Sequence, residues 1–160
     1  IEEYKGVALA YKAFTESPDL KNITLVIAGS GDLYFQRNLE KENNIIFINR
    51  YINDSEVAWL FKNAMITVYP YISATQSGVL SLSCYFGKPI VASDVPFFMT
   101  VSKEGLGLNF KGGDINSLTN TLLSLLKEDM ISISKHEKDY YELHYSKKSL
   151  RKKLLSIYNK

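Results

Sequence analysis

The residues of this sequence best suited to bind a ligand lie between Val68 and Asp94. This stretch reads as a strand, a turn of small and hydrogen-bonding residues, a helix, a Gly-Lys-Pro stop and a second strand. The turn ends in Gln76, Ser77 and Gly78. Unpaired backbone N–H groups and the positive end of the helix dipole make the start of such a helix an anion site. A parallel sheet places its ligand crevice at the carboxyl ends of its strands, so we expect a diphosphate at residues 76–79.

Length and composition predict one globular domain over residues 1–160. The chain is 46% apolar and 22% charged, which supplies enough material for a core. Cys84 is the sole cysteine, so neither an internal disulfide nor a cysteine-based metal cluster can form, and a reducing compartment fits. The sequence contains no run of 18 apolar residues and predicts no membrane-spanning segment.

The positive charge is concentrated at the C-terminal end. From Tyr145 onward there are six basic residues and no acidic one, and because the whole chain has a net charge of +2, the remainder carries −4. A basic run with leucines on the opposite helix face is usually a solvated surface. Attraction to a membrane surface is the alternative interpretation. We expect no nucleic-acid partner.

Apolar runs of strand length alternate with helical patterns along the chain. Strands separated by helices of roughly ten residues predict right-handed crossovers and a parallel sheet, so the expected fold class is α/β, a Rossmann-like doubly wound sheet. Asn53 with Glu56, and Asp114, are predicted helix caps. The expected strands are residues 23–29, 45–48, 65–69, 90–93 and 106–110, and residues 33–41 and 79–86 are expected to be helical.

Two further expectations concern burial and the start of the chain. The run at residues 23–29 is continuously apolar, which is typical of a strand buried on both faces. Leu150, Leu154, Ile157 and Tyr158 recur at helical spacing and are predicted to face inward. A doubly wound sheet normally has a strand upstream of its first helix, so we expect the sequence to be cut from a longer protein.

Five blocks of the sequence, in order, resemble the C-terminal domain of GT-B glycosyltransferases, specifically the retaining family 4 type. The blocks are EYKGVALAYKAF, LVIAGSGD, IIFINRYINDSEVAWLFKNAMITVYP, GKPIVASDV and EGLGLNFKGGDINSLTNTLLSLL. The resemblance implies one half of a GT-B fold, which binds a nucleoside diphosphate-sugar donor. A separate N-terminal domain, absent here, would bind the acceptor. The resemblance implies no metal and no other cofactor, which agrees with the absence of an Asp-x-Asp motif.

The resemblance assigns roles to particular positions. Lys5 matches a lysine that neutralises the donor phosphates, beside an arginine expected just upstream of Ile1. Gln76, Ser77, Gly78 and Val79 lie where the family holds the diphosphate. The possible nucleoside-binding residues are Gly29 and Gly31 at the end of one predicted strand, Arg50 and Tyr51 after the end of another, and Ser81 in the predicted helix at residues 79–86.

Other interpretations of these residues remain open. Lys5 could be a solvated lysine, the Gly29-Ser30-Gly31 turn plain strand-to-helix geometry, and the turn at Arg50 a surface loop. His136 and His144 are expected to face solvent, and Cys84 to be inert core packing.

The sequence departs from the family where two glutamates are expected. Alignment on Gly87-Lys88-Pro89 places Ala74 and Leu82 at those positions. In the family the second glutamate usually hydrogen-bonds the donor ribose. Either Ser81 or Ser83 holds the ribose instead, or donor binding is weak or lost. The alternative function is a degenerate, non-catalytic domain that packs on a partner protein. An epimerase of UDP-N-acetylglucosamine is less favoured, because this loop lacks acidic and histidine residues.

The predicted function is therefore the donor-binding domain of a hexosyltransferase in polysaccharide biosynthesis. The acceptor would be a glycan or a lipid-linked glycan, bound by the other domain. Alone, this domain should not turn over. The expected location is cytoplasmic, with a peripheral position at the inner face of the membrane as a further expectation.

Overall fold

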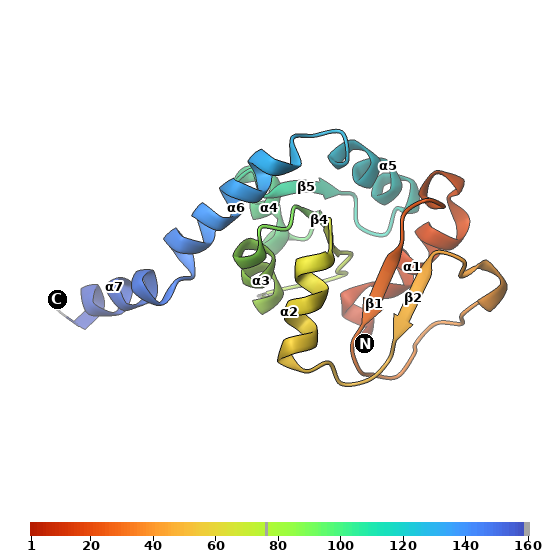
Figure 1. Ribbon diagram of the computed structural model, residues 1–160, viewed down its shortest axis with the longest axis horizontal. Coiled ribbons are helices and arrows are strands. Elements are labelled where there is room, and N and C mark those ends of the chain that lie inside the picture. The colour runs from red at the N-terminus through yellow and green to blue at the C-terminus, as the bar shows by residue number, and fades with distance from the viewer. Residues whose placement is uncertain (76, 159–160) are drawn as a thin grey trace.

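The computed structural model describes residues 1–75 and 77–158 (Figure 1). Gln76, one of the predicted diphosphate residues, lies outside the described residues. Within them the strands are β1 (Leu25–Ala28), β2 (Ile45–Ile48), β3 (Thr67–Tyr69), β4 (Ile90–Ser93) and β5 (Gly107–Phe110). The helices are α1 (Val7–Glu16), α2 (Asp54–Asn63), α3 (Gly78–Phe86), α4 (Thr100–Lys103), α5 (Ile115–Leu125), α6 (Met130–His144) and α7 (Lys147–Tyr158).

All strand pairs are parallel, as the alternating pattern predicted. β1 pairs with β2, and β4 lies between β3 and β5 in a second ladder of hydrogen bonds. Because parallel neighbours run the same way, the loops that follow the strands gather at one edge in each ladder. The predicted α/β class is confirmed, although the described strands form two ladders and not one continuous sheet.

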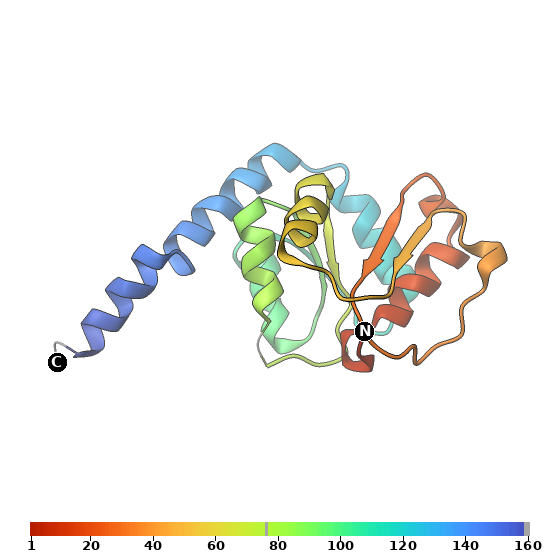
Figure 2. The ribbon, with the colours of Figure 1, turned by 60° about the horizontal axis from the view of Figure 1, so that its bottom comes forward.

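Helices cover both faces of β4, which is buried along its whole length. Val91 packs into a core with α1, α5 and β1, and Ile90 and Ala92 pack into a second core with α3 and Phe98. Neighbouring side chains of a strand point to opposite faces, so this division follows directly from the backbone. Figure 2 shows α3 and α5 on either side of the strands.

The helix caps predicted from the sequence are present. The Asn53 side chain accepts the N–H of Glu56, and the Glu56 carboxylate accepts the N–H of Asn53, which completes a capping box at α2. Asp114 accepts the N–H of Ser117 at the start of α5. These caps depend on neighbours within three residues, which is why a sequence pattern finds them.

The prediction of a helix at residues 33–41 is wrong. The segment is irregular apart from one 3₁₀ turn at Leu39–Lys41. Its side chains are anchored on α1 instead: the Phe35 ring lies 5.0 Å from that of Tyr11, and the Tyr34 hydroxyl accepts the N–H of Ala8. Contacts to another element outweigh the local preference of the segment for helix.

The expectation that β1 is buried on both faces is also wrong. Leu25 and Ile27 are buried, but Val26 is 42% exposed and its partner in β2, Ile46, is 51% exposed. The crossover that follows β1 forms no α-helix, and it leaves this face open.

The predicted inward-facing stripe of the last helix is wrong as well. α7 extends from the end of α6 away from the strands (Figures 1 and 2), and none of its residues is buried. No helix within residues 1–75 and 77–158 is long and apolar enough to cross a membrane.

Candidate nucleotide-sugar site

The start of α3 is open and uncapped, as an anion site requires. Ser77 precedes the helix in an extended conformation and makes no side-chain cap hydrogen bond. The first N–H groups of an α-helix have no partner within the helix, so those of Gly78 and Val79 are available to a ligand. A side-chain carbon added at Gly78 would meet no atom within 4 Å. The helix therefore offers backbone donors at its start, with open space beside Gly78.

This helix start is held by contacts that the sequence analysis missed. The Tyr69 hydroxyl donates to the carbonyl oxygen of Val79 over 3.1 Å and lies 2.5 Å from the hydroxyl of Ser83. Tyr69 is the last residue of β3, so the first turn of α3 is fixed to the end of that strand. Burial raises the pKa of Tyr69, which keeps its hydroxyl neutral. The sequence pattern that could have predicted this contact is a tyrosine at the end of a strand, followed by a helix that carries serines.

The loop between β3 and α3 is fixed at its base. Ser93, at the end of β4, donates a buried hydrogen bond of 2.6 Å to the carbonyl oxygen of Tyr71. The Tyr71 ring packs edge-on against Phe98 and Tyr4. The N–H of Ile72 donates to the carbonyl oxygen of Tyr4 over 2.8 Å. The loop therefore leaves the carboxyl edge of β3, as predicted, with its first residues locked in place.

These contacts bring the segment that carries Lys5 to the same loop. Gly6 adopts a left-handed conformation with φ of 63°, and a side chain there would collide with the carbonyl oxygen of Pro70. The start of α1 consequently lies against the beginning of the loop. Lys5 is 38% exposed, and its ammonium lies 3.4 Å from the carboxylate of Glu2. Lys5 is thus a partly exposed cation beside the loop, paired with a surface carboxylate in this structure.

The two glycines after β1 lie beside the first residue of the chain. Gly29 and Gly31 have φ of 150° and 147°, and a side chain at Gly31 would collide with the backbone of Ile1. The amino group of Ile1 donates to the carbonyl oxygen of Ser30. The space around Gly29 is open within 4 Å. The turn is therefore needed for close backbone approach at Gly31, whereas Gly29 leaves room for a ligand.

Arg50 and Tyr51 follow β2 at the same edge as this turn. The Asn49 side chain donates to the carbonyl oxygen of Gly31 over 3.1 Å, which joins the two loops. Arg50 makes a two-pronged contact with Glu56, and together with the N–H of Asn53 it lowers the pKa of Glu56 to about 2. Tyr51 is 75% exposed and free to stack on a planar ring. The Arg50 guanidinium orients the loop through its contact with Glu56, and the exposed ring of Tyr51 is accessible to a ligand.

The two serines considered for ribose binding have different environments. Ser83 is fully buried, and its hydroxyl lies within hydrogen-bond distance of Thr67 and Tyr69. Ser83 is therefore a core residue and cannot replace the family glutamate. Ser81 is half-buried and donates to the carbonyl oxygen of Gly78 over 2.7 Å, so its oxygen can still accept a hydrogen bond. Ala74 and Leu82 are half-buried and supply no polar group.

The remaining titratable candidates lie away from this edge. Cys84 is fully buried, and burial raises the pKa of its thiol to about 12, as an inert core residue requires. His136 is exposed and its ring nitrogen contacts the carbonyl oxygen of Glu104 at 2.7 Å. His144 stacks on Tyr140 with ring centroids 4.2 Å apart. Across residues 1–75 and 77–158, no group of three or more histidine, cysteine, aspartate or glutamate side chains could hold a metal ion.

The parallel α/β architecture is that of a domain of the GT-B glycosyltransferases. A family model described as "Glycosyl transferases group 1" matches residues 1–145. The chain therefore belongs to this glycosyltransferase family. Among curated proteins, no relative matches the chain.

Solved structures of glycosyltransferases share the fold at low sequence identity. Sucrose-phosphate synthase from Thermosynechococcus elongatus is 19% identical with a TM-score of 0.77, and the match covers 99% of this chain and 42% of that one. HepE from Anabaena, solved in complex with UDP, is 14% identical with a TM-score of 0.81, covering 99% and 46%. WaaG, a glycosyltransferase of lipopolysaccharide biosynthesis, is 16% identical with a TM-score of 0.72, covering 89% and 40%. The chain spans less than half the length of these proteins.

Proposed function

We propose that this chain is the donor-binding domain of a retaining, family 4-like hexosyltransferase that uses a nucleoside diphosphate-sugar. The observation that carries the proposal is the uncapped start of α3, with open space at Gly78 and Lys5 on the neighbouring segment. The UDP complex of HepE, which shares the fold, supports a nucleotide as the ligand.

The chemistry asked of this domain is stabilisation of the leaving group. As the bond between the anomeric carbon and the phosphate oxygen breaks, negative charge grows on the diphosphate and positive charge on the sugar ring. Fixed N–H donors at Gly78 and Val79 and the ammonium of Lys5 would stabilise that negative charge without reorganisation. One donor of this kind typically contributes about a hundredfold in rate. Gln76 and Ser77 complete the proposed diphosphate loop.

The nucleoside would lie over the loops that follow β1 and β2. Gly29 leaves open space there, Tyr51 presents an exposed ring for the base, and Ser81 can accept a hydrogen bond from the ribose. Arg50 positions the loop through Glu56. We assign no metal or other cofactor to the reaction.

The acceptor is proposed to be a glycan or a lipid-linked glycan bound by another domain, in polysaccharide synthesis on the cytoplasmic side of a membrane. Support for this class of acceptor comes from WaaG, which acts in lipopolysaccharide biosynthesis and shares the fold. We expect the chain by itself to bind donor without turnover.

Gly78→Val tests the diphosphate site. The added isopropyl group would occupy the open space in front of the helix start, so affinity for the nucleotide should be lost while the melting temperature stays unchanged. Isothermal titration calorimetry with UDP, GDP and ADP measures the affinity and identifies the base. A large fall in melting temperature would mean that Gly78 is needed for backbone geometry. Unchanged affinity in a stable variant would place the diphosphate elsewhere.

Lys5→Ala and Glu2→Gln form a matched pair with opposite expectations. Removal of the ammonium should weaken donor binding at least tenfold, since a charge-assisted hydrogen bond contributes about 1.5 to 3 kcal/mol. Removal of the Glu2 carboxylate frees Lys5 and should strengthen binding. Lys21→Ala, an exposed lysine before β1, is the control. Equal donor affinities for all three variants would mean that Lys5 is a solvated surface lysine that does not contact the donor.

The second candidate function is a non-catalytic domain that packs on a partner protein. Ala74 and Leu82 favour it, because they stand where the family has glutamates and offer no polar group. Calorimetry separates the two functions: measurable affinity for a nucleotide supports the transferase, and no affinity for UDP, GDP or ADP supports the packing domain.

A further inference from the structure

Three hydroxyl groups connect β3 to the first turn of α3. The hydroxyl of Ser83 on α3 lies 2.8 Å from that of Thr67 and 2.5 Å from that of Tyr69, the first and last residues of β3. The Tyr69 hydroxyl also lies 3.1 Å from the carbonyl oxygen of Val79. Ser83 is fully buried and Tyr69 is 7% exposed, so water does not compete for the contact between them. The three hydroxyls therefore form one connected network inside the domain.

The donors and acceptors of this network follow one direction. A carbonyl oxygen only accepts, so the single proton of the Tyr69 hydroxyl is donated to Val79. Tyr69 then accepts from Ser83, and Ser83 accepts from Thr67. The carbonyl oxygen of Lys88 is the more distant acceptor for Thr67, at 3.4 Å. Burial raises the pKa of Tyr69, so the phenol keeps the proton that it donates. The order of donation is therefore Thr67, Ser83, Tyr69 and finally the Val79 carbonyl.

The network ends on the peptide group between Val79 and Leu80. The N–H of this peptide belongs to Leu80 in the first turn of α3, where N–H groups have no partner within the helix. Hydrogen bonds in a chain polarise one another, so a carbonyl that accepts such a bond makes the N–H of its own peptide a stronger donor. The same contact fixes the orientation of the peptide relative to β3. Both effects prepare the Leu80 N–H to bind an anion at the helix start.

We propose that Tyr69 is a positioning residue for the diphosphate of the donor, and that the Leu80 N–H is a further backbone donor to it. Because this role concerns the same helix start, it rests on the proposed donor function. Tyr69 is buried and acts on the ligand through the peptide between Val79 and Leu80. Ser83 and Thr67 support it by holding the Tyr69 hydroxyl in its donating orientation. Ser83, which cannot hold the ribose, therefore contributes to the site from the core.

Tyr69→Phe tests the positioning role, because it removes the hydroxyl and keeps the ring. The probe is inorganic pyrophosphate, which carries the diphosphate without a base, and its affinity is measured by NMR titration of the backbone amides of the 160-residue chain. The amide signal of Leu80 should shift when pyrophosphate is added to the parent protein. The variant should bind pyrophosphate about fivefold more weakly, as expected for the loss of one neutral hydrogen bond. Ser83→Ala should weaken binding about twofold, because Tyr69 can still donate to Val79.

Tyr11→Phe is the matched control for the loss of a buried tyrosine hydroxyl. Tyr11 is 4% exposed, and its hydroxyl donates to the carboxylate of Glu42 over 2.9 Å, in the crossover between β1 and β2. This variant should lower the melting temperature and leave the affinity for pyrophosphate unchanged. A loss of affinity that follows overall stability would appear in both tyrosine variants.

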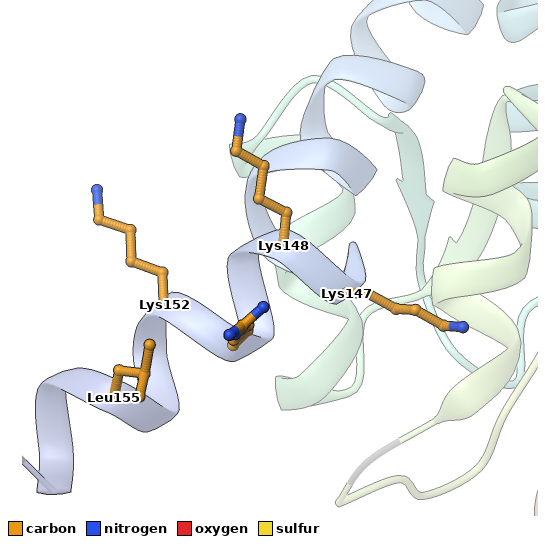
Figure 3. A pocket seen from close by; sticks show the side chains of 5 residues that line it. Lys147, Lys148, Lys152 and Leu155 are labelled. Atoms are coloured by element: carbon orange, nitrogen blue, oxygen red, sulfur yellow. The ribbon is translucent and has the colours of Figure 1, made fainter.

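A second control concerns the cations of α7, because clustered ammonium groups attract pyrophosphate by charge alone. They line a hollow on the surface of that helix, and Figure 3 shows Lys148 and Lys152 extending in the same direction. The residues that line the hollow are Lys147, Lys148, Arg151, Lys152 and Leu155. Lys148→Gln with Lys152→Gln should leave the response of the Leu80 amide unchanged. Loss of that response would mean that the signal reports binding at α7, which contradicts the positioning role.

Three results would contradict the role of Tyr69 and leave the donor site in place. They are equal pyrophosphate affinity of Tyr69→Phe and the parent, an equal loss in Tyr11→Phe, and saturable binding that does not shift the Leu80 amide. If Tyr69→Phe does not fold, Ser83→Ala decides, and an unchanged affinity in that variant counts against the network. A parent protein that binds neither pyrophosphate nor UDP, GDP or ADP would refute the donor site itself, and the positioning role with it.

Discussion

Glu137 on α6 offers a quantitative test of how the helices behind the site are packed. Its side chain is fully buried, and neither carboxylate oxygen has a hydrogen-bond partner. Burial raises the pKa of Glu137 to about 9. Lys88 opposes this shift, but its ammonium donates to the carbonyl oxygen of Lys62. Because its pKa is about 9, Glu137 is protonated in the folded protein at neutral pH. The nearby thiol of Cys84 is neutral as well.

The free energy of unfolding should therefore depend on pH in a defined direction. The unfolded carboxyl has a pKa of 4.5, so between 4.5 and about 9 the folded protein holds a proton that the unfolded chain releases. The contribution of Glu137 is most favourable below 4.5 and is lost as the pH rises, by about 1.4 kcal/mol for each unit. From pH 4.5 to about pH 7 the loss amounts to about 3 kcal/mol.

Glu137→Gln removes the titration and keeps the shape of the side chain. We expect equal stability for the two proteins near pH 4.5 and a variant more stable by about 3 kcal/mol near pH 7. Urea denaturation at a series of pH values, followed by the fluorescence of Trp59, measures the difference. Glu142→Gln, an exposed carboxylate on the same helix, is the control and should show no such trend.

Two results would refute this reasoning. A difference between Glu137→Gln and the parent protein that is constant with pH would mean that Glu137 does not change its protonation on unfolding. A parent protein that gains stability relative to Glu137→Gln as the pH rises would mean that Glu137 is ionised and paired in the folded state.

Two further predictions concern the segments that position the site. Gly6→Ala should lower the melting temperature and weaken nucleotide binding, because it places a side chain on a left-handed residue and against the carbonyl oxygen of Pro70. The control Gly113→Ala, at φ of 77° with no atom within 4 Å, should lower the melting temperature less, through backbone conformation alone. Equal losses in the two variants would contradict the close approach of Gly6 to Pro70. Asn53→Ala should cost about 1 kcal/mol in thermal or urea denaturation through loss of the α2 capping box, and an unchanged stability would show that Glu56 does not depend on it.

The positions of the candidate site could be named from the sequence because helix starts and strand ends are local features. The turn before Gly78, the cation at Lys5 and the glycines after β1 are visible as residue types at particular positions. The contacts that fix them were not: Ser93 reaches Tyr71 across 22 positions of the chain, and the residues between them give no sign of the pairing. For the same reason Ser83 was considered for ribose binding although it is in the core.

The sequence by itself determined the parallel α/β class, the strand Ile90–Ser93 and the caps at Asn53 and Asp114, because these depend on hydrophobic runs and on neighbours a few residues apart. Tertiary structure alone decided which apolar faces are covered. Residues 33–41 do not form the predicted helix, because their aromatic rings pack on α1. One face of β1 is therefore left uncovered. The stripe of α7 looks like a core face in sequence and lies in solvent in the fold, since periodicity defines a face but does not specify what packs against it.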